Sequence, residues 1–145
     1  MVIDEDILQT CIARLRNLPP VKGVRLTMGG KSPLPKEIDA LLAVRTEMGQ
    51  VHFGVQVKTM LRRPIPEHLS IAGPRIDRPV LIMTRYANPS IAESLKQRRI
   101  NFIDTEGNAF INVPRFIYVD IQSRKPSQEH TRRPKALFRP KSLQL

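Results

Sequence analysis

The sequence is poor in cysteine, tryptophan and acidic residues, and each shortage excludes something. Its 145 residues include one Cys, no Trp, two Tyr and five Phe, and 13 acidic residues stand against 24 Lys and Arg. A single Cys cannot form a disulfide within the chain or supply a zinc cluster. The aromatic residues are too few and too scattered to predict a base-stacking surface.

Long hydrophobic runs are also lacking. No apolar run approaches the roughly 18 residues that a membrane-spanning helix needs, and the beginning of the sequence has no apolar segment typical of a secretory signal. We therefore expect a cytoplasmic protein that is not associated with a membrane. Thirteen Pro against seven Gly predict many breaks in the secondary structure.

Positive charge is concentrated in the last part of the sequence. Residues 123–145 hold seven Lys and Arg, one Glu and three Pro, with few apolar side chains. Burial cannot offset the ordering entropy of such a segment, so we expect a flexible basic tail or linker after a single domain at 1–122. A polyanion such as DNA is its expected partner, and a solvated tail without a partner is the alternative.

The hydrophobic pattern of residues 1–122 predicts alternating helices and strands. Helical spacing marks 4–18 and the segment that follows Asn88 and Pro89, and a short helix is expected near 66–73. Strands are expected at 21–28, 37–44, 51–59, 78–86, 100–104, 109–113 and 115–122. This order predicts an α/β fold with a mixed sheet flanked by helices.

The strands expected at 37–44 and 51–59 contain the most informative polar residues. A polar connection with a glycine joins them, so they should form an antiparallel hairpin. Asp39, Gln56 and Lys58 would share one face of this hairpin if the register allows. Asp39 and Gln56 could then bind a hard cation through oxygen, with Lys58 as the catalytic cation. Glu37 and Glu5 are further candidates for a metal ligand or a base.

Each of these residues also has a purely structural explanation. Asp39 and Lys58 could form an ion pair across the hairpin, worth no more than about 1 kcal/mol if exposed. We favour the catalytic interpretation over the ion pair, because Gln56 joins the same face between apolar strands. Glu37 could be a solvated strand end, and Glu5 could simply oppose the helix dipole.

The stretch EIDALLAVRTEMGQVHFGVQVK, residues 37–58, resembles the core of restriction-endonuclease-like, or PD-(D/E)XK, nucleases. In that superfamily an acid on one strand precedes a (D/E/Q)-x-K triplet on the next. Asp39 matches the acid, Gln56-Val57-Lys58 matches the glutamine form of the triplet found in the Mrr-like branch, and the acid of the family's first helix would fall at Glu5. The chain departs from the family's pattern in two ways: glutamine lowers the negative charge at the cation site, and no proline directly precedes Asp39.

This resemblance implies a restriction-endonuclease-like mixed sheet flanked by helices over residues 1–122. It implies hydrolysis of DNA with Mg²⁺, or Mn²⁺ in its place, bound by Asp39 and Gln56. Lys58 would assist the attack of water, and Glu5 and Glu37 would complete the catalytic set. Nucleases of this class often work as dimers, so a homodimer is one expected assembly.

A second resemblance covers RRINFIDTEGNAFINVPRFIYVDIQSRKP, residues 98–126. This stretch is similar to a segment of bacterial type IV abortive-infection antitoxin-like proteins and predicted transcriptional regulators, and Asp104, Gly107, Asn108 and Phe110 carry the match. In those proteins a basic linker and a winged-helix DNA-binding domain follow. The resemblance implies a non-catalytic DNA-binding or antitoxin-like module that uses a relic nuclease fold, with a protein partner. A further alternative is a domain that needs a winged helix for any activity.

Phosphate contacts are expected from basic side chains outside the hairpin. Arg98 and Arg99 end the helix expected after Asn88, where cations also oppose the helix dipole. The tail supplies the other candidates for DNA binding, which are Arg124, Lys125, Arg132 and Arg133.

Overall fold

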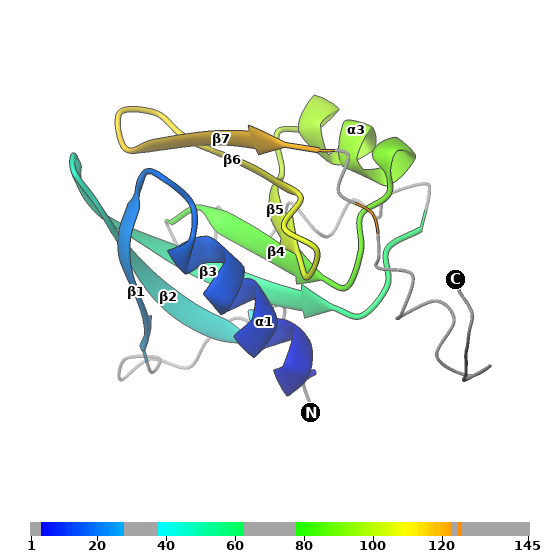
Figure 1. Cartoon of the computed structure of the whole chain (residues 1–145), viewed down its shortest axis with the longest axis horizontal. Helices are drawn as coiled ribbons and strands as arrows, with labels where there is room; N and C mark the ends of the chain where they lie inside the picture. The colour runs from blue at the N-terminus through cyan, green and yellow to red at the C-terminus, as the bar shows by residue number, and fades with distance from the viewer. Residues whose placement is uncertain (1–3, 28–37, 63–77, 123–124, 126–145) are drawn as a thin grey trace, which may run out of the picture.

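A computed structural model describes residues 4–27, 38–62, 78–122 and 125 of the protein (Figure 1). Its elements, in chain order, are α1 (Glu5–Arg16), β1 (Val21–Thr27), β2 (Ala40–Thr46), β3 (Gly49–Lys58), β4 (Val80–Thr84), α3 (Pro89–Gln97), β5 (Asn101–Asp104), β6 (Ala109–Val113) and β7 (Ile117–Ile121). Glu37, Arg124, Arg132, Arg133 and the short helix expected near 66–73 lie outside the described residues.

The seven strands form one mixed sheet in sequential order, β1 to β7. β1, β2 and β3 are antiparallel neighbours, β3, β4 and β5 are parallel to one another, and β5, β6 and β7 are again antiparallel neighbours. The carboxyl ends of β3, β4 and β5 therefore meet at the same edge of the sheet. Open α/β sheets bind their ligands at such an edge.

Helix α1 lies inside the curl of the sheet (Figure 1). The helix expected from the sequence at 4–18 is confirmed, and Asp4 caps it by accepting a hydrogen bond from the Ile7 amide at 3.2 Å. Its apolar side chains join one core cluster with side chains from all the strands. Burial of these apolar side chains stabilises the helix more than the intrinsic helix propensity of its residues does.

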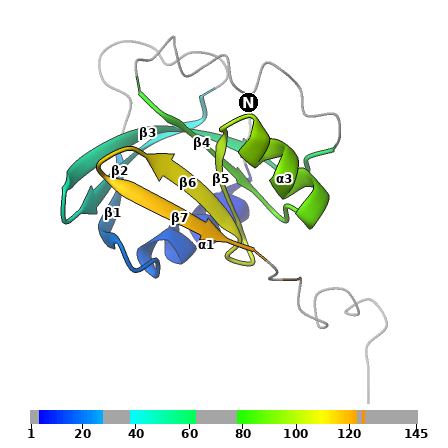
Figure 2. The same cartoon turned by 90° about the horizontal axis from the view of Figure 1, so that it is seen from above.

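Helix α3 packs beside the sheet with a second and smaller cluster (Figure 2). Asn88 caps the helix by accepting a hydrogen bond from the Ile91 amide at 2.9 Å, and Pro89 takes the first helical position, as the sequence predicts. Leu81 and Met83 of β4 belong to the α1 cluster, whereas Ile82 belongs to the α3 cluster. Because neighbouring strand residues point to opposite faces, α1 and α3 cover opposite faces of β4.

The mixed α/β sheet expected from the sequence is confirmed, with shifted strand ends. β2 begins at Ala40 instead of Glu37 and continues to Thr46, so the turn to β3 is shorter than the expected connection. The Thr46 hydroxyl causes this tight turn, because it donates to the Gly49 carbonyl at 2.8 Å and accepts from the Met48 amide at 3.1 Å.

Two hairpin tips meet at Gly49. Its φ of +130° is a conformation that only glycine adopts readily. A Cβ placed there would lie 2.9 Å from Cε1 of Phe116, in the turn between β6 and β7. The contact links distant parts of the curled sheet.

We expect Gly49→Ala to lower the free energy of unfolding by about 1–3 kcal/mol, from backbone strain and the clash with Phe116. Urea denaturation followed by circular dichroism measures the change. Gly23→Ala is the matched control, because a Cβ there would meet the flexible end of Arg45 at 3.3 Å and the φ is not positive. Equal losses in the two variants would contradict this explanation.

Cys11 lies where α1 meets the ends of β4 and β5. Its thiol is fully buried and lies 3.8 Å from the Thr84 carbonyl and 3.6 Å from the Ile103 carbonyl. Burial, with a smaller contribution from the charge of Asp104, raises the pKa of Cys11 from 9.0 to about 12. The native protein therefore keeps the thiol protonated under conditions where the unfolded chain loses the proton.

This raised pKa makes stability fall with pH. Below pH 9 the thiol is protonated in both states and has no effect. As the pH rises from 9 towards 12 only the unfolded chain releases the proton, which costs about 1.4 kcal/mol of stability per pH unit. Cys11→Ala should show a shallower decline over this range in urea denaturation, whereas parallel curves would contradict the assignment.

Candidate functional site

Asp39 lies just before the first paired residue of β2, next to the end of β3. Ala40 pairs with Val55 and Leu41 with Gly54, but this register does not continue to Asp39, whose amide bonds to the carbonyl of Val55, the residue that already faces Ala40. Two hydrogen bonds hold this end of the hairpin. The Asp39 amide donates to the Val55 carbonyl at 2.8 Å, and the Val57 amide donates to Oδ2 of Asp39 at 2.8 Å.

Of the three residues expected on one face, Gln56 and Lys58 share a face of β3. On β3 the alternate residues Val55 and Val57 belong to the α1 cluster. Gln56 and Lys58 therefore point to the opposite face. Asp39 does not continue the alternation of β2, because Ile38 before it packs with Leu41 in one cluster. The expected antiparallel hairpin is confirmed, and at its end the Asp39 carboxylate bonds to the amide of Val57, between Gln56 and Lys58 in the sequence.

The Gln56 side chain is fully buried, and neither its Oε1 nor its Nε2 has a hydrogen-bond partner. Across the part of the chain that the structure describes, the other buried side-chain atoms in this condition are Oγ1 of Thr84 and Nε2 of Gln122. A buried polar group without a partner costs about 1–3 kcal/mol. A buried amide that keeps this cost is a candidate for binding a ligand or for a catalytic role.

Thr84 lies next to Lys58 on the neighbouring strand. The parallel register of β3 and β4 pairs Gln56 with Ile82 and Lys58 with Thr84. Thr84 is fully buried, whereas Lys58 is partly exposed. Thr84 is the one member of this polar group that the motif does not contain; its signal in the sequence is a threonine that ends the buried run VLIM.

An ion pair between Asp39 and Lys58 does not form. The salt bridges among the described residues join other partners, and Asp39 instead binds the backbone of Val57. The structural alternative considered for these two residues is therefore not what holds the hairpin together.

Glu5 lies at the same edge of the sheet but on the other face. It is exposed in the first turn of α1, which packs on the face opposite to Gln56. Its neighbours Asp4 and Asp6 lie 3.2 and 3.7 Å from the guanidinium of Arg85, which follows the end of β4. The structure does not bring Glu5 onto the face of Gln56 and Lys58.

Two side-chain oxygen atoms near the end of this hairpin are of a type that binds hard cations. Oδ2 of Asp39 is used by the Val57 amide, while Oδ1 of Asp39 and Oε1 of Gln56 are oxygen atoms of the kind that Mg²⁺ binds. No group of three or more His, Cys, Asp or Glu side chains that could hold a metal ion occurs among the described residues.

Asp104, at the end of β5, binds four donors. Its Oδ1 accepts from the Glu106 and Asn108 amides at 3.0 and 2.9 Å, and its Oδ2 accepts from the Ala87 amide and the Asn108 side chain, both at 2.9 Å. Burial raises the pKa of Asp104, although the four hydrogen bonds oppose the shift. The carboxylate therefore ties the loop before α3 to the TEGN turn, which explains the Asp104 and Asn108 pattern structurally.

We expect Asp104→Asn to destabilise the fold by more than about 2 kcal/mol, because an amide NH₂ would face N–H groups and leave them unpaired. Asp120→Asn is the matched control: the exposed Asp120 contacts Lys96 at 3.0 Å, and its loss should cost less than about 1 kcal/mol. Thermal unfolding compares the two variants. A loss as small for Asp104→Asn as for the control would refute the structural role.

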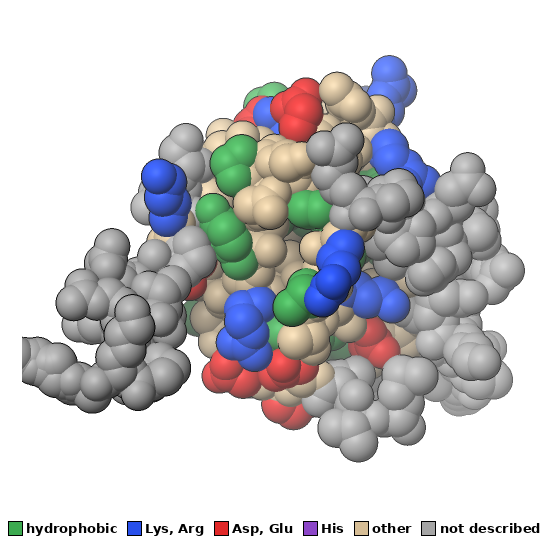
Figure 3. All heavy atoms as spheres, turned by 90° about the vertical axis from the view of Figure 1, so that its right-hand side faces the viewer, with side chains coloured by type: hydrophobic (Ala, Val, Ile, Leu, Met, Phe, Trp, Pro, Cys, Tyr) green, Lys and Arg blue, Asp and Glu red, His purple; other side chains and the backbone are tan. Residues whose placement is uncertain are grey.

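The basic residues expected to bind DNA lie at different edges. Arg98 ends α3 and Arg99, with φ of 59°, leads into β5, so both lie at the amino ends of the parallel strands. Lys125 is exposed and follows β7, which is parallel to β5 and ends at the edge of Lys58 and Thr84. Figure 3 shows the side of the molecule where β3 and β7 end, which is the right-hand side of Figure 1. Basic and acidic side chains lie next to each other there.

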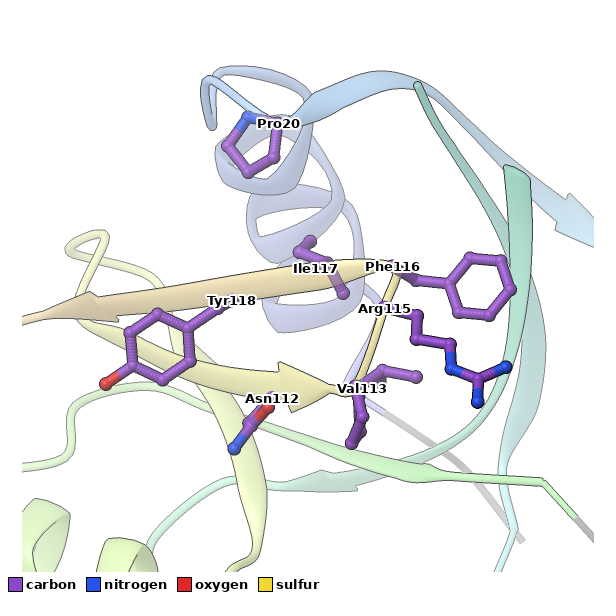
Figure 4. Close-up of a pocket in the computed structure, with 8 residues that line it drawn as sticks. Pro20, Asn112, Val113, Arg115, Phe116, Ile117 and Tyr118 are labelled. Atoms are coloured by element: carbon purple, nitrogen blue, oxygen red, sulfur yellow. The ribbon is translucent and has the colours of Figure 1, made fainter. Parts of the chain in front are cut away.

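A shallow hollow of about 280 Å³ lies at the opposite edge of the sheet (Figure 4). It is lined by Pro20 and by residues 112–118 of the β6–β7 hairpin. Tyr118 is exposed and its ring contacts Phe110 edge to face, with the centroids 6.3 Å apart. The hollow is separate from the face of Gln56 and Lys58.

Comparison of the chain with protein-family models, with curated proteins and with solved structures finds no match. The relation to PD-(D/E)XK nucleases therefore stays a prediction from residues 37–58. None of the helices in the described ranges has the length and apolar character needed to cross a membrane.

Proposed function

We propose that the protein acts on DNA through a PD-(D/E)XK-type site and hydrolyses phosphodiester bonds with the help of a divalent cation. The observation that carries the proposal is the fully buried Gln56 amide without a partner, on the same face of β3 as Lys58, with the Asp39 carboxylate bound to the intervening Val57 amide. A sheet that served only as a scaffold would favour an apolar residue at this position, as it has at Ile82 on the next strand.

The three side chains divide the chemistry between them. Asp39 presents a carboxylate whose orientation the Val57 amide fixes, and the Gln56 carbonyl would complete the protein's share of a cation site. When bound, Mg²⁺ supplies Lewis-acid polarisation of the phosphoryl group. Lys58 holds a proton at Nζ and would offset the negative charge that develops on the phosphoryl oxygens.

Charge favours a nucleic acid as the substrate. The chain carries a net charge of +11, and the basic tail sequence follows β7 at the edge where β3 and β4 end. Contacts between Lys or Arg and phosphates would supply affinity that is independent of DNA sequence and falls as salt rises. The cytoplasm and a homodimer remain the location and assembly expected from the sequence.

A non-catalytic DNA-binding or antitoxin-like module is the second candidate. The hydrogen bond from Val57 to Asp39 favours it, because it gives the carboxylate a structural role at the end of the hairpin. Asn would keep an acceptor for this bond but remove the charge. Asp39→Asn therefore separates the two candidates without opening the hairpin.

We expect the wild-type protein to nick supercoiled plasmid with Mg²⁺ or Mn²⁺, and Asp39→Asn and Lys58→Ala to lose at least about 100-fold of this rate. Asp39→Asn removes the negative charge that would hold the cation, and Lys58→Ala removes the positive charge that would stabilise the phosphoryl oxygens. Agarose gels measure nicking over time, and circular dichroism checks that the variants remain folded.

Glu47→Gln and Lys22→Ala are the matched controls, since their exposed ion pair of 3.4 Å lies at the other edge of the sheet and its loss should leave nicking unchanged. Nicking that persists in both Asp39→Asn and Lys58→Ala would overturn the nuclease proposal. Plasmid binding without nicking, equally strong in EDTA and in Asp39→Asn, would favour the non-catalytic module.

A further inference from the structure

The face of the sheet opposite to α1 carries positive charge where β1, β2 and β3 pair. Val44 of β2 belongs to the α1 cluster, so its neighbours Ala43 and Arg45 point to the other face. Arg25 of β1 and His52 of β3 both pair with Ala43, which places them on this face as well. We call Arg25, Arg45 and His52, which are all exposed, the arginine–histidine patch.

Within the described residues, no helix covers the arginine–histidine patch. The core cluster of α3 includes side chains of β4, β5 and β6 but none of β1, β2 or β3, and Figure 2 shows α3 beside β4 and β5. No acidic residue occupies this face of β1, β2 or β3 over their described lengths, and no salt bridge between described residues includes the patch. The charge of the two arginines is therefore available to a partner.

The fold holds the Arg45 guanidinium on the surface of the sheet. Its Nη2 donates to the Lys22 carbonyl at 3.3 Å, and it lies over Gly23, where an added Cβ would be 3.3 Å away. Glycine thus leaves room for the guanidinium on β1. This bond uses one of the five N–H donors of arginine, and the others remain for an oxyanion such as phosphate.

Two observations favour a nucleic acid as the partner of this patch. Basic side chains on an edge strand can serve only to prevent pairing with another sheet, but Arg45 and His52 lie on the inner strands β2 and β3. A protein partner would need an apolar centre in its contact surface, whereas a phosphate backbone needs positive charge. None of the exposed large apolar side chains lies on this face of the described β1, β2 and β3; they are Leu26, Met48, Met60 and Tyr118.

We propose that the arginine–histidine patch contacts the phosphate backbone of DNA, with Arg25 and Arg45 as the phosphate-binding cations. His52 and Lys58 lie on the same face of β3, and the strand between them spans about 20 Å, or roughly six base pairs of duplex. A duplex across the patch would therefore reach the end of β3 that carries Lys58. The inference deepens the proposed function, on which the choice of DNA as the ligand rests.

Binding of the full-length protein to a short fluorescent DNA duplex, followed by fluorescence anisotropy in EDTA, tests the proposal without cleavage. Each phosphate contact contributes about −0.9 to the slope of log K against log salt. We therefore expect Arg25→Gln and Arg45→Gln each to make this slope shallower by about 0.9 and to weaken binding roughly tenfold at about 0.1 M salt. A double variant with the slope and affinity of the wild type would overturn the proposal.

The double variant Arg16→Gln, Arg115→Gln is the matched control. It removes the same charge from the end of α1 and from the turn between β6 and β7, both outside the patch, so its slope should stay close to that of the wild type. An equal loss in this control would make the effect one of net charge and refute the assignment. The double variant Arg25→Lys, Arg45→Lys keeps the charge and should keep the slope, whereas a slope as shallow as that of the glutamine variant would refute a phosphate contact.

An acidic polypeptide is the alternative partner for a cationic surface. Polyglutamate should displace the fluorescent duplex less effectively than unlabelled DNA of equal charge does, because it lacks the phosphates that arginine binds through two N–H groups. Equal displacement by the two polymers would overturn the choice of a nucleic acid.

Plasmid nicking separates this inference from the proposed function. If both hold, the double variant Arg25→Gln, Arg45→Gln has a raised KM for plasmid and an unchanged kcat, because the patch binds DNA but takes no part in the chemistry. Absence of nicking in the wild type, with weaker DNA binding in the double variant, would end the nuclease proposal and leave the DNA-binding surface established. Nicking in the wild type, with DNA binding unchanged in the double variant, would overturn the role of the patch and leave the nuclease proposal standing.

Discussion

The register of β2 against β3 determines which polar groups share a face of the sheet. The Asp39 carboxylate accepts a hydrogen bond from the Val57 amide at the end of the hairpin, next to the last paired residues Ala40 and Val55. A slip of one residue would turn Gln56 into the cluster around α1. Every later argument about the site depends on this one short connection between the two strands.

Polar side chains gather where the parallel strands end. Gln56 and Lys58 close β3, Thr84 closes β4 and Asp104 closes β5. Asp104 is satisfied by four donors, whereas Gln56 and Thr84 keep unpartnered buried atoms. Asp104 therefore stabilises the loops around it, whereas the unpartnered atoms of Gln56 and Thr84 lower the stability of the fold. This difference places the candidate site at the ends of β3 and β4.

Local patterns in the sequence predict the elements well because each carries its own signal. Asn88 and Pro89 mark the start of α3, and the alternation in residues 51–58 predicts the faces of β3 correctly. The strand start at Ala40 and the tight turn at Thr46 depend on hydrogen bonds formed only after the strands pair. Thr84 is found only through the register of β3 and β4, because residues 26 positions apart show no pattern that links them.

The most direct test of the account follows the side-chain amide of Gln56 by NMR as Mg²⁺ is added. The account predicts that the Gln56 NH₂ signals shift and saturate in the wild type, and that Asp39→Asn removes the shift because the site loses its charge. Saturating shifts elsewhere with Gln56 unmoved, or no response at any concentration that the protein tolerates, would contradict a cation site built from Asp39 and Gln56.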